Sequence, residues 1–184
     1  MKRIIIIHGW SGSPDDNWLP WLKSELGKLG HDVIVPSMPD ADNPIIEDWV
    51  NYLSSVVNEP NSNTYLIGHS IGCQAIMRYL ENIDKKIGGV IFVSGLFNLE
   101  NMVSDEEERI AKPWIKTPIN LEKIKMIISK STLIISDNDP YDAFEENKKK
   151  FTELGSKIVV LHNAEHITDL KCPEILSETV TLLE

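Results

Sequence analysis

The chain has 184 residues, which is enough for one domain that buries about 70% of its unfolded surface without disulfides. It carries 18 Lys and Arg against 28 Asp and Glu, a formal net charge of -10, and this acidity argues against nucleic acids and anionic membranes as partners. The two cysteines, Cys73 and Cys172, lack the spacing of a zinc site, and the apolar run at residues 4–7 is too short for a signal peptide or a membrane span. We therefore expect a soluble cytoplasmic protein.

The first part of the chain predicts strands that alternate with helices. Residues 4–7 are an uninterrupted β-branched run, which is typical of a parallel strand buried on both faces. The loop at residues 8–14 is Gly-rich but has neither the dinucleotide-binding spacing nor the lysine of a P-loop, so we expect no phosphate cofactor. Regularly spaced leucines predict a helix over residues 18–29 with an N-cap from residues 16–17, and residues 33–35 predict a second strand.

The alternation continues through the middle of the chain. Pro44 suits the first turn of a helix that contains residues 45–56. A strand at residues 65–67 and a helix at residues 73–82 follow, and residues 88–93 predict a fourth buried strand. This pattern predicts a mostly parallel α/β sheet with right-handed crossovers.

Residues 96–130 interrupt this alternation. The connection is too long for an ordinary loop, and we interpret it as a small cap over the site within a single domain of residues 1–184. Residues 132–136 and 157–161 complete a sheet of about six strands, with a helix between them and a last helix from Pro173.

Residues 64–72, which read T-Y-L-I-G-H-S-I-G, contain the motif G-x-S-x-G between a predicted strand and a predicted helix. In that setting the motif predicts a nucleophile elbow, a turn so sharp that the serine is held in a strained backbone conformation with its hydroxyl above the sheet. Gly68 and Gly72 fit because side chains there would collide with the neighbouring strand or helix. Ser70 is therefore the candidate nucleophile.

Candidates for an acid and a base follow the later strands. His166, in a polar turn after the last strand, is our candidate for the base that accepts the Ser70 proton. Asp137 and Asp139 compete for the acid that orients the imidazole. We favour Asp139, which stands further into the loop ahead of Pro140, and expect Asp137 to bind backbone N–H groups. The order nucleophile, acid, histidine is that of α/β-hydrolases.

The other histidines near these strand ends are assigned structural roles. We expect His162 to point sideways or cap its strand, and His69 to face away from the reacting side of Ser70. His31 is expected at the surface.

An acyl-transfer site also needs donors for an oxyanion and a pocket for the acyl group. The backbone N–H of Ile71, directly after the nucleophile, and that of Trp10, in the first loop, are the candidate donors. The pocket is expected to be apolar and to be shaped together with the cap. Its candidate residues are Trp10, Met38, Leu96, Phe97 and Trp114.

These residues resemble the small serine hydrolases of the family that includes retinoblastoma-binding protein nine and the bacterial YdeN-type proteins. The similarity covers nearly the whole chain and includes H-G-W, N-W-L-P-W-L-K, the M-P-D loop, G-H-S-I-G, V-S-G and the D-P pair after the fifth predicted strand. The resemblance implies a compact α/β-hydrolase, a three-layer sandwich without a large lid, whose triad falls on Ser70, Asp139 and His166. Glu165 departs from the family, which usually has Gly before the histidine; its carboxylate either raises the pKa of the histidine or points to solvent.

The leading hypothesis is a serine hydrolase that cleaves small carboxylic esters through an acyl-enzyme on Ser70, with no metal or cofactor. An alternative is an interaction module that keeps the hydrolase shell and binds a protein partner through the cap at residues 96–130. An amidase or peptidase, or a thioesterase, would use the same triad.

Overall fold

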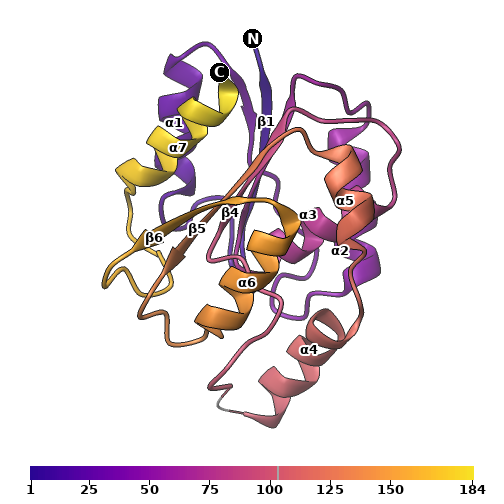
Figure 1. Cartoon of the computed structure of the whole chain (residues 1–184), viewed down its shortest axis with the longest axis vertical. Coiled ribbons are helices and arrows are strands. Elements are labelled where there is room, and N and C mark those ends of the chain that lie inside the picture. Colours follow the sequence, from indigo (N-terminus) through magenta and orange to yellow (C-terminus); the bar gives the residue numbers. More distant parts are fainter. Residues whose placement is uncertain (103) are drawn as a thin grey trace.

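The computed structural model describes residues 1–102 and 104–184, so residue 103 of the predicted cap lies outside the described part. The described residues form six strands and seven helices (Figure 1). The strands are β1 (Arg3–Ile7), β2 (Asp32–Ile34), β3 (Thr64–His69), β4 (Gly89–Val93), β5 (Ser131–Ser136) and β6 (Lys157–Leu161). The helices are α1 (Leu19–Lys28), α2 (Ile46–Val57), α3 (Ile71–Glu81), α4 (Asp105–Lys116), α5 (Leu121–Ile127), α6 (Phe144–Leu154) and α7 (Pro173–Leu183).

One sheet contains the strands in the order β2-β1-β3-β4-β5-β6, and each neighbouring pair is parallel. Helices α1 and α7 lie on one side of the sheet, and α2, α3, α5 and α6 lie on the other (Figure 1). The predicted parallel α/β sandwich is therefore confirmed. Among the described residues, no helix combines the length and the apolar character needed to span a bilayer.

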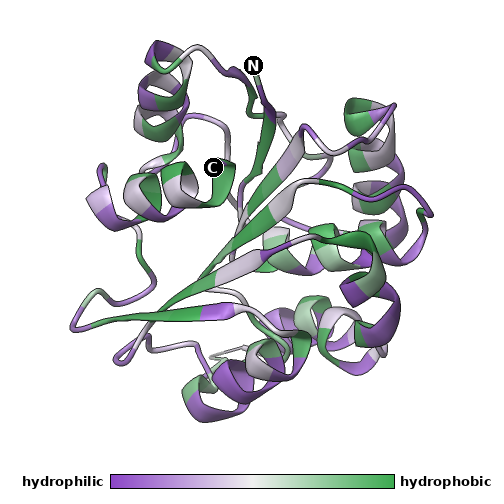
Figure 2. Cartoon of the chain, turned by 45° about the horizontal axis from the view of Figure 1, so that its top comes forward, coloured by the Kyte–Doolittle hydropathy of each residue, from purple (hydrophilic) through white to green (hydrophobic). Residues whose placement is uncertain are grey.

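Alternate residues of the central strands pack against opposite helical layers. In β1, Ile4 and Ile6 belong to the core under α1 and α7, whereas Ile5 and Ile7 belong to the core under the other helices. Because both faces of the strand are covered, both sets of side chains must be apolar. Figure 2 shows the result as green strands enclosed by helices whose outer sides are largely purple.

The strand order places the carboxyl ends of the central strands at one edge of the sheet. Ile7 of β1 pairs with Gly68 of β3, and His69 pairs with Val93 of β4. The loops after these strands therefore start side by side, which is where sites form in open parallel sheets.

Two helix starts differ from the predictions. The N-cap expected from residues 16–17 does not form, because the Asp16 carboxylate accepts a hydrogen bond from the Ser13 N–H (2.7 Å) instead. Pro44 precedes α2 rather than occupying its first turn. Its carbonyl oxygen accepts a hydrogen bond from Trp114 Nε1–H (2.9 Å), which joins this loop to α4.

The segment predicted as a cap divides between two locations. Helix α4 lies at the end of the molecule where the strands finish (Figure 1). Helix α5 packs against α3 and α6, with Ile124 and Ile127 in the main core, so it belongs to the helical layer. Arg78 of α3 holds the end of α4, donating hydrogen bonds to the carbonyl oxygens of Trp114 (2.8 Å) and Thr117 (3.0 Å).

Candidate active site

Ser70 occupies the tight turn between β3 and α3. Its backbone has φ 53° and ψ -123°, in the positive-φ region that non-glycine residues rarely adopt. The turn is held on both sides, since the Ser70 N–H donates to the Val93 carbonyl (2.9 Å) and the Cys73 N–H donates to the Ser70 carbonyl (2.9 Å). The turn thus has the strained geometry that the motif predicts.

The two motif glycines leave no room for a side chain. A Cβ on Gly68 would lie 2.8 Å from the backbone nitrogen of Cys73, and one on Gly72 would lie 2.6 Å from the carbonyl oxygens of Ile7 and His8. These are backbone atoms of an adjacent strand end and of the helix start, so they cannot rotate away. Glycine is therefore required at both positions, because the backbone of the turn lies so close to the end of β1 and the start of α3.

Asp139 and His166 meet across the loops that follow β5 and β6. His166 Nδ1–H donates to the Asp139 carboxylate over 2.6 Å. The Asp139 side chain is fully buried (0% exposed), and that of His166 is 19% exposed. The other Asp139 oxygen accepts the Tyr141 N–H (3.0 Å). Because Nδ1 is engaged with the carboxylate, Nε2 remains as the basic nitrogen.

Two further groups fix the main chain of His166. Its carbonyl oxygen accepts hydrogen bonds from His69 Nε2–H (3.0 Å) and from the Ser94 hydroxyl (3.1 Å). Burial, followed by the charge of His166, lowers the pKa of His69 to about 4, so the His69 ring is neutral at pH 7. His69 therefore supports the loop that carries His166.

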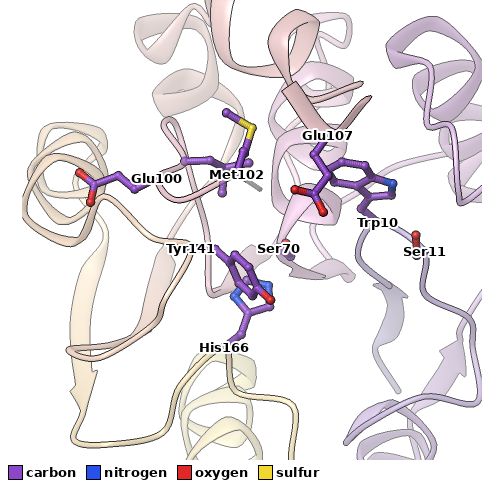
Figure 3. Close-up of a pocket in the computed structure, with 9 residues that line it drawn as sticks. Trp10, Ser11, Ser70, Glu100, Met102, Glu107, Tyr141 and His166 are labelled. Atoms are coloured by element: carbon purple, nitrogen blue, oxygen red, sulfur yellow. The ribbon is translucent and has the colours of Figure 1, made fainter. Parts of the chain in front are cut away.

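Ser70 and His166 line one cavity of about 340 Å³ at the carboxyl edge of the sheet (Figure 3). Tyr141 packs edge-on against His166, with 5.5 Å between ring centroids. Within the described part of the chain, no hydrogen bond joins Ser70 Oγ to His166. In free enzymes catalytic hydrogen bonds are often long or poorly aligned and tighten only when the substrate binds, so the absence of this bond does not exclude proton transfer from Ser70 to His166.

Asp137 makes a second carboxylate–histidine pair outside this cavity. Its carboxylate accepts a hydrogen bond from His162 Nδ1–H (2.5 Å) and another from the Asn163 N–H (3.1 Å). The hydrogen bond from His162 is the main cause that lowers the pKa of Asp137. Since the His162 side chain is 78% exposed, this pair organises a surface loop.

The two candidate oxyanion donors lie beside Ser70. Among the described residues, neither the Trp10 N–H nor the Ile71 N–H donates a hydrogen bond. A Cβ on Gly9 would lie 3.1 Å from the Ser70 Cβ, so the loop before Trp10 runs close to the serine. His8 steadies this loop, because its Nε2 accepts the Met38 N–H (3.0 Å). Ile71 is the first residue of α3, where backbone N–H groups attract negative charge.

The cavity walls differ from the predicted pocket. Of the five predicted residues, only Trp10 lines the cavity, with its Nε1–H bonded to the Asp42 carbonyl (2.9 Å). Met38, Leu96 and Trp114 are buried in or against the core. The other lining residues, which the sequence analysis did not identify, are Ser11, Leu99, Glu100, Met102, Glu107 and Tyr141.

Phe97 is turned away from the cavity by the residue that anchors its backbone. Asn147 of α6 is fully buried, and its Oδ1 accepts the N–H groups of Phe97 (2.7 Å) and Asn98 (2.9 Å). The Phe97 ring then packs on Phe151, with 5.0 Å between centroids. Together with Trp114 it lines a different hollow, next to α5. No local sequence pattern distinguishes Asn147 as this anchor. Tyr141, by contrast, directly follows the Asp139-Pro140 pair, and this position could have indicated that it lines the cavity.

Glu165 has an exposed side chain and a backbone φ of 48°, in the region that favours glycine. This explains why a glycine suits the position before His166. Replacing Glu165 by Gly is therefore expected to raise the free energy of unfolding by up to about 1 kcal/mol, measured by urea denaturation. The matched control is Asp169→Gly, at an exposed loop position without a positive φ, which should lower it. Equal destabilisation by both changes would contradict the strain at Glu165.

The cysteines are not suited to nucleophilic chemistry. Burial raises the pKa of the Cys73 thiol far above its usual value and that of Cys172 to about 11. Within the described residues, no group of three or more His, Cys, Asp or Glu side chains could hold a metal ion.

The chain is similar in sequence to proteins described as hydrolases. YdeN of Bacillus subtilis (strain 168) is 43% identical over 96 residues, which cover 51% of this chain and 50% of YdeN, so the aligned part spans about half of that relative. Serine hydrolase RBBP9 of Rattus norvegicus is 24% identical over 180 residues, covering 97% of this chain and 89% of RBBP9.

Solved structures show the same fold. The crystal structure of the YdeN protein from B. subtilis has a TM-score of 0.90 at 26% identity and covers 99% of this chain and 98% of its own. A carboxylesterase structure from the thaumarchaeon Nitrososphaera gargenis has a TM-score of 0.75 at 15% identity and covers 99% of this chain and 90% of its own. At this level of identity the similarity concerns the fold alone. The predicted α/β-hydrolase fold is thus confirmed. Residues 4–172 match the model of the family described as serine hydrolase, and the chain belongs to that family.

Proposed function

We propose that the protein hydrolyses carboxylic esters of small substrates through an acyl-enzyme on Ser70, with His166 as base and Asp139 as its orienting acid. The observation that carries the proposal is the buried 2.6 Å hydrogen bond between Asp139 and His166, at a cavity that Ser70 also lines. Membership of the serine hydrolase family supports the same chemistry.

In the first half of the reaction, His166 Nε2 accepts the Ser70 proton as Oγ attacks the ester carbonyl carbon. The N–H groups of Trp10 and Ile71 donate hydrogen bonds to the oxyanion that forms, each worth about 3 kcal/mol in the transition state. The C–O bond to the alcohol then breaks, and the imidazolium protonates the leaving oxygen. Asp139 stabilises the imidazolium and stays ionised.

In the second half, a water molecule gives a proton to His166 Nε2 and attacks the acyl carbon. The second oxyanion collapses, the bond to Ser70 Oγ breaks, and the proton returns to the serine. The products are a carboxylic acid and the free enzyme. His166 Nε2 accepts or donates the proton in each transfer of this scheme.

Replacing Ser70 by Ala is expected to abolish labelling by a fluorophosphonate probe and to abolish hydrolysis of short p-nitrophenyl esters. The reason is that Ser70 Oγ is the atom that forms the covalent bond. Ser11→Ala is the matched control, since Ser11 lines the same cavity and its loss should leave labelling intact. Labelling of the Ser70→Ala variant at the native rate would refute the proposal, and absence of labelling in the native protein would favour a binding module.

A substrate panel separates the related activities. Rates on an ester, a thioester and an amide with the same acyl group would be compared, each with the Ser70→Ala variant as background. The proposal expects the ester to have the highest kcat/KM of the three. A faster amide would indicate an amidase or peptidase.

A further inference from the structure

The cavity beside Ser70 combines aromatic side chains with carboxylates. Trp10 and Tyr141 are the aromatic residues of its lining, and Glu100 and Glu107 are the acidic ones. Within the described residues, no Lys or Arg lines this cavity. Aromatic faces attract cations, among them quaternary ammonium groups, and carboxylates add a direct attraction between opposite charges.

A second cavity, of about 370 Å³, adjoins Ser70 and His166 on the side of the first loop. Asp15 and Asp16 are among its lining residues, and the described lining again contains no Lys or Arg. Both approaches to the nucleophile are therefore negatively charged. The potential at the site favours a cationic substrate and repels an anionic one.

Glu107 is the carboxylate best placed to contact a substrate. It comes from the first turn of α4, is half-buried, and its carboxylate points to the cavity beside Trp10 (Figure 3). The carboxylate of Glu100 is exposed and turned away from Ser70 in the same view. Arg109, on the same helix as Glu107, is directed to Glu106 and Asn43 and does not line the cavity.

An acidic first turn also stabilises a helix, and α4 begins with four acidic residues, Asp105 to Glu108. That role is common to the whole turn and does not depend on facing the cavity. Glu108 shares the turn but is exposed and lines a separate surface hollow with Lys112 and Lys116. Glu108→Gln is therefore the control for the stabilisation of α4 that its acidic residues share.

We propose that the active site prefers esters that carry a positively charged group, such as a quaternary ammonium, and that Glu107 is the specificity-determining residue. The inference rests on the proposed ester hydrolysis at Ser70 and specifies its substrate class. The cation lies between the Glu107 carboxylate and the Trp10 ring while Oγ attacks the carbonyl carbon, so charge recognition and bond cleavage involve different groups.

The test uses two esters of the same shape, butyrylcholine and 3,3-dimethylbutyl butyrate, which differ only in the quaternary nitrogen or carbon. Acid release measured by pH-stat at low salt is expected to give a kcat/KM about tenfold higher for the cationic ester. Glu107→Gln should reduce that ratio about fivefold. Glu108→Gln should leave the ratio unchanged.

Equal rates on the two esters, or equal effects of Glu107→Gln and Glu108→Gln on their ratio, would overturn the inference. Equilibrium binding of both esters to the Ser70→Ala variant measures the same preference without turnover. Tighter binding of butyrylcholine together with no hydrolysis by the native protein would contradict the proposed function and leave the charge preference standing. Equal binding of the two esters together with normal hydrolysis would contradict the charge preference and leave the proposed function standing.

Discussion

The Asp139→Asn variant is expected to lose about 10³- to 10⁴-fold in kcat on a p-nitrophenyl ester. The amide can offer its NH₂ group to His166 Nδ1, which leaves the imidazole with the wrong tautomer and removes the charge that stabilises the imidazolium. KM should change little, since Asp139 is not among the residues that line the cavity. Stopped-flow or steady-state rates with a thermal melt for each variant would measure this.

The control is Asp137→Asn, two positions earlier in the same loop. Asp137 also accepts hydrogen bonds from a histidine and a backbone N–H, but its partner, His162, is exposed outside the cavity. This variant is expected to keep kcat within about threefold of native, because a surface hydrogen bond contributes little to a distant reaction. A comparable loss of kcat in both variants would mean that the loop as a whole, and not the acid at position 139, matters.

The Gly72→Ala variant is expected to lower the free energy of unfolding by about 3 kcal/mol or more. Its Cβ would lie 2.6 Å from the carbonyl oxygens of Ile7 and His8. Because Ile7 is paired with Gly68 of β3, these atoms can move only if the sheet and α3 separate. In a chain of this size the melting temperature should fall by about 10 °C, measured by calorimetry.

Gly27→Ala is the matched control for this change. Gly27 lies within α1, and an added Cβ would meet nothing within 4 Å. Alanine is the better helix former, so this variant should gain about 0.5 to 1 kcal/mol. If Gly72→Ala melted at the native temperature, the close contact between the elbow and β1 would not exist in solution.

Several features were predictable because they depend on neighbouring residues in the chain. The bounds of β6 and the start of α7 at Pro173 follow from an apolar run and from the position of a proline. The candidate pair Asp139 and His166 was found because parallel strands finish at one edge, so residues just after two strands come together. The helix starts near residues 16–18 and 44–46 were not predicted correctly, because the Asp16 carboxylate and the Pro44 carbonyl oxygen accept hydrogen bonds from partners outside these helices.

The cavity walls could not be predicted, because they are built from segments far apart in the chain. Leu99 pairs with Asp142 in an isolated antiparallel bridge, and the Glu100 N–H donates to the Tyr141 carbonyl (2.8 Å). These contacts bring the start of the cap segment against the loop that carries Asp139. A hydrogen bond between residues some forty positions apart has no periodic pattern in the sequence.

The sequence by itself determined the parallel sheet, the elbow at Ser70 and the choice of candidate acid and base, because each depends on hydrophobic periodicity or on a residue's position after a strand. The tertiary structure decided which side chains face the substrate. Buried Asn147 turns Phe97 into the core, Arg78 holds the end of α4, and Glu107 of that helix lines the cavity. Pocket shape and charge therefore arise from long-range contacts, which only the folded chain contains.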